Sequence, residues 1–132
     1  MITRTASCRC GQLTATATGE PVRVSVCHCL ACQQRSGSAF AVQARWPADQ
    51  VALAGRSQAW QRAADSGHAT IFHFCPDCGS TVHYSGGHVP DHIAIPVGAF
   101  ADPAFPPPRF SVWEERKHAW VEILGQDVEH DD

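Results

Sequence analysis

Three cysteines, Cys27, Cys29 and Cys32, lie within six positions of one another. They follow a short apolar segment, 22–26, whose alternation is typical of a β-strand, so the chain is expected to turn where the three sulfurs occur. Such a turn can bring all three sulfurs around one metal ion. Three protein ligands with one vacant position are the pattern of a catalytic zinc ion, whereas a structural zinc ion takes four. The spacing therefore predicts an open zinc site.

Soft thiolate ligands select zinc among the common divalent ions. Three thiolates give the site a formal charge of about −1, which suits it to holding a further soft ligand better than to generating hydroxide. A thiol that takes the vacant position loses its proton, because zinc stabilises the thiolate form. The residues alone thus predict zinc-assisted thiol chemistry.

Other interpretations of these three cysteines stay open at the level of sequence. His28 could supply a fourth ligand and close the site, although its side chain should point away from its cysteine neighbours if the local backbone is extended. The three cysteines could also be redox-active thiols. A histidine from farther along the chain could also close the site, and the candidates are His68, His73, His83, His88 and His92.

The other four cysteines form two close pairs, Cys8 with Cys10 and Cys75 with Cys78. Two cysteines at C-x-x-C spacing can present both sulfurs to one ion, and Gly79 allows a turn through positive φ that directs backbone N–H groups toward sulfur. Together the pairs predict a closed, tetrahedral and structural zinc site that joins the start of the chain to its middle. The alternative is that all four are buried free thiols.

The composition excludes several classes of protein. Seven cysteines in 132 residues cannot all pair in intramolecular disulfides, and metal binding or catalysis explains them better in a reducing compartment. A net charge of −3 with 17% charged residues provides no basic surface for nucleic acid. The sequence has no apolar run typical of a signal peptide, and no stretch approaches the roughly 20 apolar residues that cross a membrane. We therefore expect a cytoplasmic protein that binds neither nucleic acid nor a membrane.

Short segments of alternating polarity dominate the sequence and predict a mainly β fold of short antiparallel strands with little helix. One short helical turn is expected over 30–36, and a hairpin turn at 65–67. The expected strands are 12–18, 22–26, 39–46, 51–55, 57–63, 69–74, 81–85, 92–97, 110–115 and 119–123.

A single domain is expected over 1–124, because 44% hydrophobic residues are enough for one core. Trp113 and Trp120 are expected to lie in that core or in the wall of a pocket, with the core favoured. The proline-rich segment 103–109 is expected to be a rigid crossing loop. The polar segment 125–132 is predicted to be a flexible acidic tail.

With both cysteine groups in place, the chain resembles the glutathione-dependent formaldehyde-activating family, which includes centromere protein V. The matching stretches are "CRCG" (8–11), "CHCLACQQRSGSAF" (27–40), "FCPDCGS" (74–80) and "VWEERKHAW" (112–120). The resemblance implies a zinc-stapled, Mss4-like β fold, similar to that of the zinc-containing chaperones of Rab GTPases. It also implies two zinc ions per chain, a structural one at Cys8, Cys10, Cys75 and Cys78 and a catalytic one at Cys27, Cys29 and Cys32.

The type activity of the family implies an S-(hydroxymethyl)glutathione synthase, a carbon–sulfur lyase that runs in the direction of addition. On this reading, the sulfur of glutathione takes the open position at the three-cysteine site and attacks the carbonyl carbon of formaldehyde. The protein would mainly orient the two reactants and supply thiolate at neutral pH. The expected partners are therefore glutathione or another small thiol, and a small aldehyde.

Glutathione carries two carboxylates, which a binding site should meet with cations or N–H groups. Arg35, three residues after Cys32, is the first candidate, and Ser36 and Ser38 are candidate hydrogen-bond donors. Weaker candidates are Arg45, Arg116 and Lys117.

Two other functions compete with the enzyme. The chain could be a zinc-stabilised binding module without chemistry, as centromere protein V suggests, or a thiol or zinc sensor with labile cysteines. Substituting Cys32 by serine separates the first from the enzyme. A folded binding module would keep its affinity for a partner, whereas the enzyme would lose thiol–aldehyde turnover.

Overall fold

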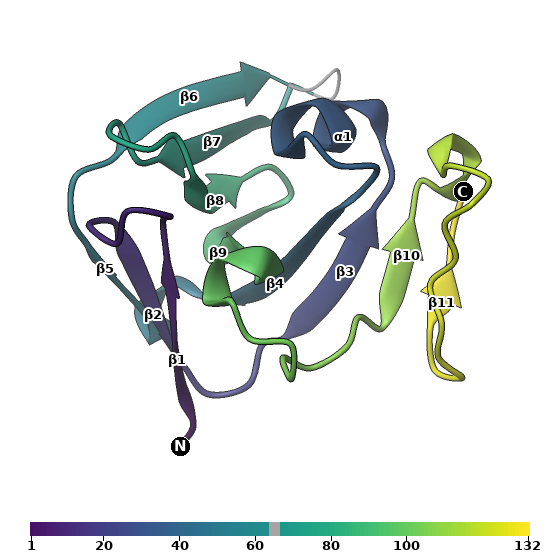
Figure 1. Cartoon of the computed structure of the whole chain (residues 1–132), viewed down its shortest axis with the longest axis horizontal. Coiled ribbons are helices and arrows are strands. Elements are labelled where there is room, and N and C mark those ends of the chain that lie inside the picture. Colours follow the sequence, from purple (N-terminus) through teal and green to yellow (C-terminus); the bar gives the residue numbers. More distant parts are fainter. Residues whose placement is uncertain (64–66) are drawn as a thin grey trace.

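The computed structural model describes residues 1–63 and 67–132 (Figure 1). Within them the chain forms two β-sheets and one short helix, α1 (Leu30–Ser36). The smaller sheet has the strand order β1-β2-β5 and is antiparallel throughout. Its strands are β1 (Thr3–Ser7), β2 (Thr14–Thr18) and β5 (Val51–Ala54).

The larger sheet has the order β11-β10-β3-β4-β9-β8-β7-β6. Along the part of this order that runs β3-β4-β9-β8-β7-β6, each pair of neighbouring strands is antiparallel. Strand β10 runs parallel to both β3 and β11. Its strands are β3 (Arg23–Cys27), β4 (Ala41–Pro47), β6 (Gln58–Ala63), β7 (Ala69–Phe74), β8 (Thr81–Gly86), β9 (Val89–Pro96), β10 (Phe110–Val112) and β11 (Glu129–His130). Short 3₁₀ turns occupy Ala48–Gln50, Val97–Phe100 and Glu114–Arg116.

The hydrophobic core lies between one face of the larger sheet and the smaller sheet. Trp46 on β4 is fully buried in it, and its indole N–H donates to the carbonyl oxygen of Gly19 at 3.0 Å. The smaller sheet contributes alanines, which have little side chain and allow the two layers to approach closely. The main buried members are Ala6, Leu13, Ala15, Ala17, Val24, Ala44, Trp46, Val82, Ile95 and Phe105.

The opposite face of the larger sheet is polar. Successive side chains of a strand point to opposite faces, so Val24 enters the core while Arg23, Ser25 and Cys27 lie on the other side of β3. The pairing of Arg23 with Arg45 on β4 puts the second arginine on the same face. Helix α1 covers part of this face, because its Arg35 guanidinium lies over a ring of β8, that of Tyr84. The candidate site is therefore on the face that the core does not use.

The predicted mainly β fold is confirmed, and each expected strand range except 119–123 overlaps a strand of the structure. The strand at 119–123 is wrong, because residues 119 and 120 lie in a turn and 121–123 do not form a strand. Strand β1 was not predicted at all. The short helical turn expected over 30–36 is confirmed as α1.

Other expectations meet mixed outcomes. Trp113 and Trp120 are 51% and 75% exposed, so the favoured placement in the core is wrong, whereas Trp113 lines a cavity, as the alternative placement expects. The expected tail contributes β11, which pairs with β10, where a flexible end was expected. The expected turn at 65–67 falls largely outside the described residues, although β6 and β7 pair antiparallel on either side of it. In the described part of the chain, no helix combines the length and apolar character that crossing a membrane requires.

We expect Gly55→Ala to lower the free energy of unfolding by about 2 kcal/mol or more. Gly55 has a φ of +96°, and a Cβ there would meet the carbonyl oxygen of Gln12 at 2.0 Å, so backbone strain adds to a clash with another backbone. Denaturant unfolding followed by circular dichroism measures the change. Gly98→Ala is the matched control, because no atom lies within 4 Å of its added Cβ. Equal stability of the two variants would contradict this close approach.

Candidate metal centres

The four cysteines predicted to share a closed site come together at the β1–β2 and β7–β8 turns. Their Sγ atoms all lie within 4.8 Å of one another, with Cys8 to Cys10 at 3.6 Å and Cys10 to Cys75 at 3.7 Å. With zinc–sulfur bonds of about 2.3 Å, a tetrahedral site places its sulfurs about 3.8 Å apart. All seven cysteines are free, so no disulfide explains this closeness. The group, completed by Cys78, therefore fits a closed metal site.

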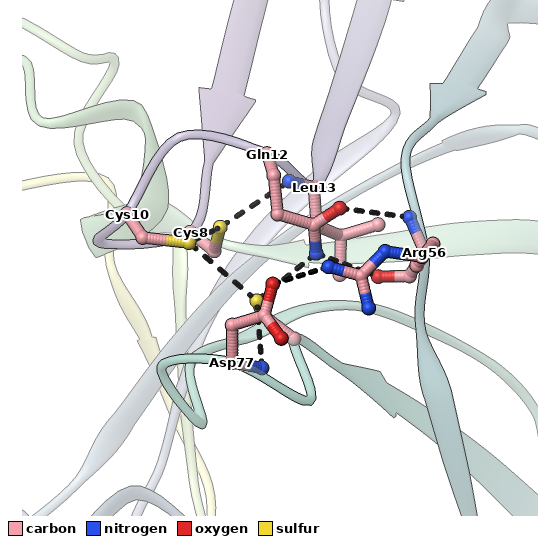
Figure 2. A network of polar contacts seen from close by, with 7 residues as sticks. Cys8, Cys10, Gln12, Leu13, Arg56 and Asp77 are labelled. Carbon is pink, nitrogen blue, oxygen red and sulfur yellow. Dashed lines mark hydrogen bonds and ion pairs between the residues drawn. The ribbon is translucent and has the colours of Figure 1, made fainter.

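Donor groups of the surrounding chain point at these sulfurs, as Figure 2 shows for part of the network. The N–H of Leu13 donates to Cys8 Sγ at 3.3 Å, and the N–H of Asp77 donates to Cys75 Sγ at 3.4 Å. Such bonds favour the charged thiolate, which is the form that binds metal. Gly79 has a φ of +83°, which confirms the expected positive φ after the C-x-x-C pair.

The side chain of Gln12 links the group to the segment between β5 and β6 (Figure 2). Its Nε2 donates to Cys75 Sγ at 3.0 Å and to the carbonyl oxygen of Arg56 at 2.8 Å, and its Oε1 accepts from the Arg56 N–H at 2.9 Å. The Arg56 guanidinium in turn pairs with Asp77 in the C-x-x-C loop. Both charged groups are exposed, so the pair itself contributes little stability. The network nevertheless fixes three separate segments around the sulfurs.

The second group forms where β3 ends and α1 begins. Cys27 is the last residue of β3, and Cys29 is the N-cap of α1, where its Sγ accepts from the N–H of Cys32 at 3.3 Å. The three Sγ atoms lie within 4.8 Å of one another. Cys27 is buried and the other two are half-buried. The predicted turn thus gathers three sulfurs that can hold a metal ion, in a donor set that suits zinc.

His28 is fully buried but is not among the ligand atoms of this group. The Ser111 hydroxyl donates its one hydrogen to Glu114 Oε2 at 2.6 Å. Ser111 Oγ must therefore accept from His28, whose Nε2–H donates to it at 2.9 Å. The same carboxylate oxygen accepts from His130 Nδ1 at 2.7 Å. Burial lowers the pKa of His28, which keeps the imidazole neutral in this chain of hydrogen bonds. His28 therefore ties β3 to β10 and β11 and does not close the cysteine site.

The more distant histidines also lie apart from the sulfurs. Among residues 1–63 and 67–132, no histidine joins either cysteine group. Four of them pair with one another instead, the rings of His68 and His88 at 4.7 Å and those of His73 and His83 at 4.5 Å. Of the candidate fourth ligands, His88 and His92 line a cavity that reaches Cys27.

The electrostatics of the second group favour one thiolate before any metal is considered. Hydrogen bonding between Cys27 and Cys32, together with burial, raises the pKa of Cys27. The same hydrogen bond is the main cause that lowers the pKa of Cys32 to about 6. A hydrogen bond with Cys29 and the charge of the nearby Arg35 guanidinium lower it further. Deprotonated sulfur is what a metal requires, and Arg35 is positioned to stabilise its charge.

Two cavities border the three-cysteine group on the polar face of the sheet. The one called cavity A has a volume of about 420 Å³ and reaches Cys27. Arg23 and Arg45 lie opposite each other in its wall, and both are half-buried. Burial is the main cause that lowers the pKa of Arg45, and the positive charge of Arg23 lowers it further. In the described part of the chain, neither arginine forms an ion pair with a carboxylate. The polar face thus presents two positive charges without a protein counter-ion.

Cavity B has a volume of about 360 Å³ and reaches Cys32. Its lining residues are Ala31, Cys32, Gln34, Arg35, Trp60, Arg62 and Phe72. Arg35, the first sequence candidate for ligand binding, therefore lies beside the sulfurs, with its guanidinium 5.0 Å from the ring centre of Phe72.

The two serines predicted with Arg35 are placed differently. Ser36 and Ser38 line neither cavity A nor cavity B, and the Ser36 Oγ accepts from the N–H of Ser38 at 3.2 Å. A role for them in binding stays a prediction. Of the weaker candidates, Arg45 lines cavity A, whereas Arg116 and Lys117 line neither cavity.

Sequence reasoning missed Arg23, Gln43 and Tyr84 as residues of the site. A usable signal was present for Arg23, because Arg23, Ser25 and Cys27 recur at every second position of a strand and must share a face. Gln43 and Tyr84 carry no such signal, since their place depends on the pairing of β4 and β8 with other strands. Tyr84 donates to Gln43 Oε1 at 3.0 Å in the wall of cavity A.

Removal of one ligand should affect the two groups differently. We expect Cys75→Ser to abolish metal binding at the closed group and lower Tm by about 15 °C or more, because binding energy at a structural site is folding energy. Cys32→Ser should lose metal only at the open group and lower Tm by about 5 °C or less. Elemental analysis and thermal unfolding measure both quantities. An equal loss of Tm in the two variants would contradict the division into a closed and an open site.

Comparisons with known proteins identify the family of the chain and a similar fold. Residues 3–116 match the family model described as glutathione-dependent formaldehyde-activating enzyme. The fold is similar to a crystal structure of a Rhodobacter sphaeroides protein, with a TM-score of 0.59 and 18% identity over 75% of this chain and 91% of that chain. A search of curated proteins finds no match. Because the family model spans most of the chain, the protein belongs to the glutathione-dependent formaldehyde-activating enzyme family.

Proposed function

We propose that this protein is a carbon–sulfur lyase-type enzyme that adds the thiol of glutathione to a small aldehyde, with formaldehyde as the family's type substrate. The observation that carries the proposal is the three-cysteine group at the end of a cavity with two arginines that form no ion pair within residues 1–63 and 67–132. Family membership supports the reaction class. The product is a hemithioacetal alcohol, S-(hydroxymethyl)glutathione when the aldehyde is formaldehyde.

Two zinc ions per chain are proposed as cofactors. Cys8, Cys10, Cys75 and Cys78 would hold the structural ion, and Cys27, Cys29 and Cys32 the catalytic one. A zinc ion at the second group, with one position left to a substrate, supplies thiolate at neutral pH by lowering the pKa of the bound thiol.

Arg23 and Arg45 would bind carboxylate groups of glutathione. Like charges that face each other across two strands destabilise a sheet, and burial adds to that cost. An anionic ligand would remove this repulsion, and guanidinium groups bind carboxylates in two-pronged fashion. Arg23 lies four residues before Cys27 on the same strand face, a separation of about 13 Å between backbones. The long arginine side chains reduce that span, so a thiol with a remote carboxylate fits better than a compact one.

Arg35 would stabilise negative charge at the reacting end. Its guanidinium lowers the pKa of Cys32 and lies over the rings of Phe72 and Tyr84, which hold it in place. During addition the sulfur electron pair forms the C–S bond and the carbonyl electron pair moves onto oxygen. That oxygen then takes the proton that the thiol gave up, so no oxidant or reductant is needed. Arg35 lines the same cavity as Cys32 and can therefore stabilise this charge.

Exchange spectroscopy tests the proposed reaction, because thiol–aldehyde addition is reversible and also proceeds without an enzyme. We expect zinc-loaded protein to raise the rate of exchange between formaldehyde hydrate and S-(hydroxymethyl)glutathione at least tenfold above buffer. Cys32→Ser should return the rate to the buffer value, while Arg116→Gln, which is exposed and lines neither cavity, should leave it unchanged. A wild-type rate equal to buffer would overturn formaldehyde as the substrate, and rates equal to buffer with larger aldehydes as well would favour a binding module or sensor.

Arg45→Gln should weaken glutathione binding about tenfold to a hundredfold, the scale of a lost charge-assisted hydrogen bond. The same change should leave Tm unchanged or raise it, because it also removes repulsion with Arg23. Calorimetric titration and thermal unfolding measure the two effects, and Arg116→Gln is again the matched control. Weaker binding accompanied by a lower Tm would point to damage to the fold and contradict the assignment.

A further inference from the structure

We propose that cavity B receives an aromatic ring of the aldehyde. The natural electrophile of this protein is then an aldehyde that carries an aromatic ring and is larger than formaldehyde. The inference rests on the proposed addition of a thiol. The inference concerns cavity B, which reaches Cys32. The arginines proposed to bind carboxylates line cavity A, which reaches Cys27.

A row of three aromatic rings crosses the sheet toward the cysteines. Trp60 pairs with Phe72, and Phe72 pairs with Tyr84, on the neighbouring strands β6, β7 and β8. The ring centres are 5.9 Å apart in the first pair and 4.9 Å apart in the second. Cross-strand aromatic pairs stabilise sheets, which accounts for the two inner rings. It does not account for the indole of Trp60, which is 54% exposed beside a cavity while Phe72 is 8% exposed.

The size of cavity B does not suit formaldehyde. A water molecule occupies about 30 Å³ of liquid, and formaldehyde has only two heavy atoms. Cavity B has a volume of about 360 Å³, within the range of pockets that enclose drug-sized ligands. Its walls include the indole of Trp60 and the ring of Phe72, and an aromatic ligand ring can stack on or meet these edge to face.

The same cavity leads to the reacting end of the site. Cys32 and Arg35 both line it, and the Arg35 guanidinium lies 5.0 Å from the ring centres of Phe72 and Tyr84. An aldehyde whose ring stacks beside Trp60 can direct its carbonyl group toward Cys32. Its oxygen would then accept a hydrogen bond from Arg35, and the thiol held on the cavity A side would meet the carbonyl carbon. The arrangement gives each reactant its own cavity with the sulfurs at their junction.

Binding of an unreactive analogue tests the cavity separately from the reaction. The probe is 2-phenylethanol, which has the ring and chain of phenylacetaldehyde but no carbonyl group. Saturation-transfer NMR on the zinc-loaded protein should show contact with the ring protons of the probe. Trp60→Ala should weaken this binding about tenfold, whereas Trp120→Ala should not change it. Trp120 is the matched control because it is 75% exposed and lines neither cavity.

Turnover supplies the second readout, using glutathione with phenylacetaldehyde and with formaldehyde. We expect the protein to accelerate addition to phenylacetaldehyde more than addition to formaldehyde, each relative to buffer. Trp60→Ala should reduce the first acceleration about tenfold and leave the second within twofold. Together with probe binding that depends on Trp60, this result would support the inference.

Three results would overturn it, and they separate its failure from that of the proposed function. Acceleration with formaldehyde alone would refute the aromatic aldehyde and leave the thiol addition standing. Probe binding that is absent, or equal in the two tryptophan variants, would refute cavity B as the site of the ring. Acceleration with neither aldehyde would refute the thiol addition and the inference with it.

Discussion

The register between β3 and β4 determines where the side chains at the centre of the candidate site lie. In this register Arg23 pairs with Arg45 and Val24 with Ala44, so one face of the pair is charged and the other is apolar. A slip of one residue would exchange the faces, bringing arginines into the core and valines into cavity A. The apolar requirement of Val24 and Trp46 therefore fixes the positions of residues that themselves contribute nothing to the core. Packing on one side of the sheet sets the chemistry on the other.

The four-cysteine group would stabilise the domain in which this register forms, because the domain is small. The core has only a thin second layer, built from alanine-rich strands that bury little apolar surface per residue. Bonds from Cys8 and Cys10 to a shared ion would hold that layer against the turn after β7, through sulfurs that already lie 3.6 and 3.7 Å apart. The close approach at Gly55 and the contacts of Gln12 serve the same junction. Metal ligation at this group would thus compensate for what a core of this size lacks.

Sequence reasoning reached the metal groups and the β class because both depend on local features. Cysteine spacing and short alternating segments can be read without knowing which strands pair, and the helical turn after Cys32 is local as well. The errors concern pairing between distant segments. The segment 119–123 alternates like a strand, but it pairs with no strand in the described part of the chain. The core was favoured over a pocket wall for Trp113, yet this residue adopts a left-handed conformation with a φ of 58° and borders cavity A.

Charge on the polar face follows from the same reasoning and differs from the charge of the whole chain. The protein carries a net charge of −3, yet Arg23 and Arg45 line the cavity that reaches Cys27, and Arg35 lines the one that reaches Cys32. Three thiolates on a divalent ion leave about one negative charge, so the arginines exceed it and the face should attract anions. At physiological ionic strength this attraction extends about 8 Å. The attraction therefore acts on a thiol that is already entering the cavity. It favours thiols whose carboxylates lie at the right distance from the sulfur.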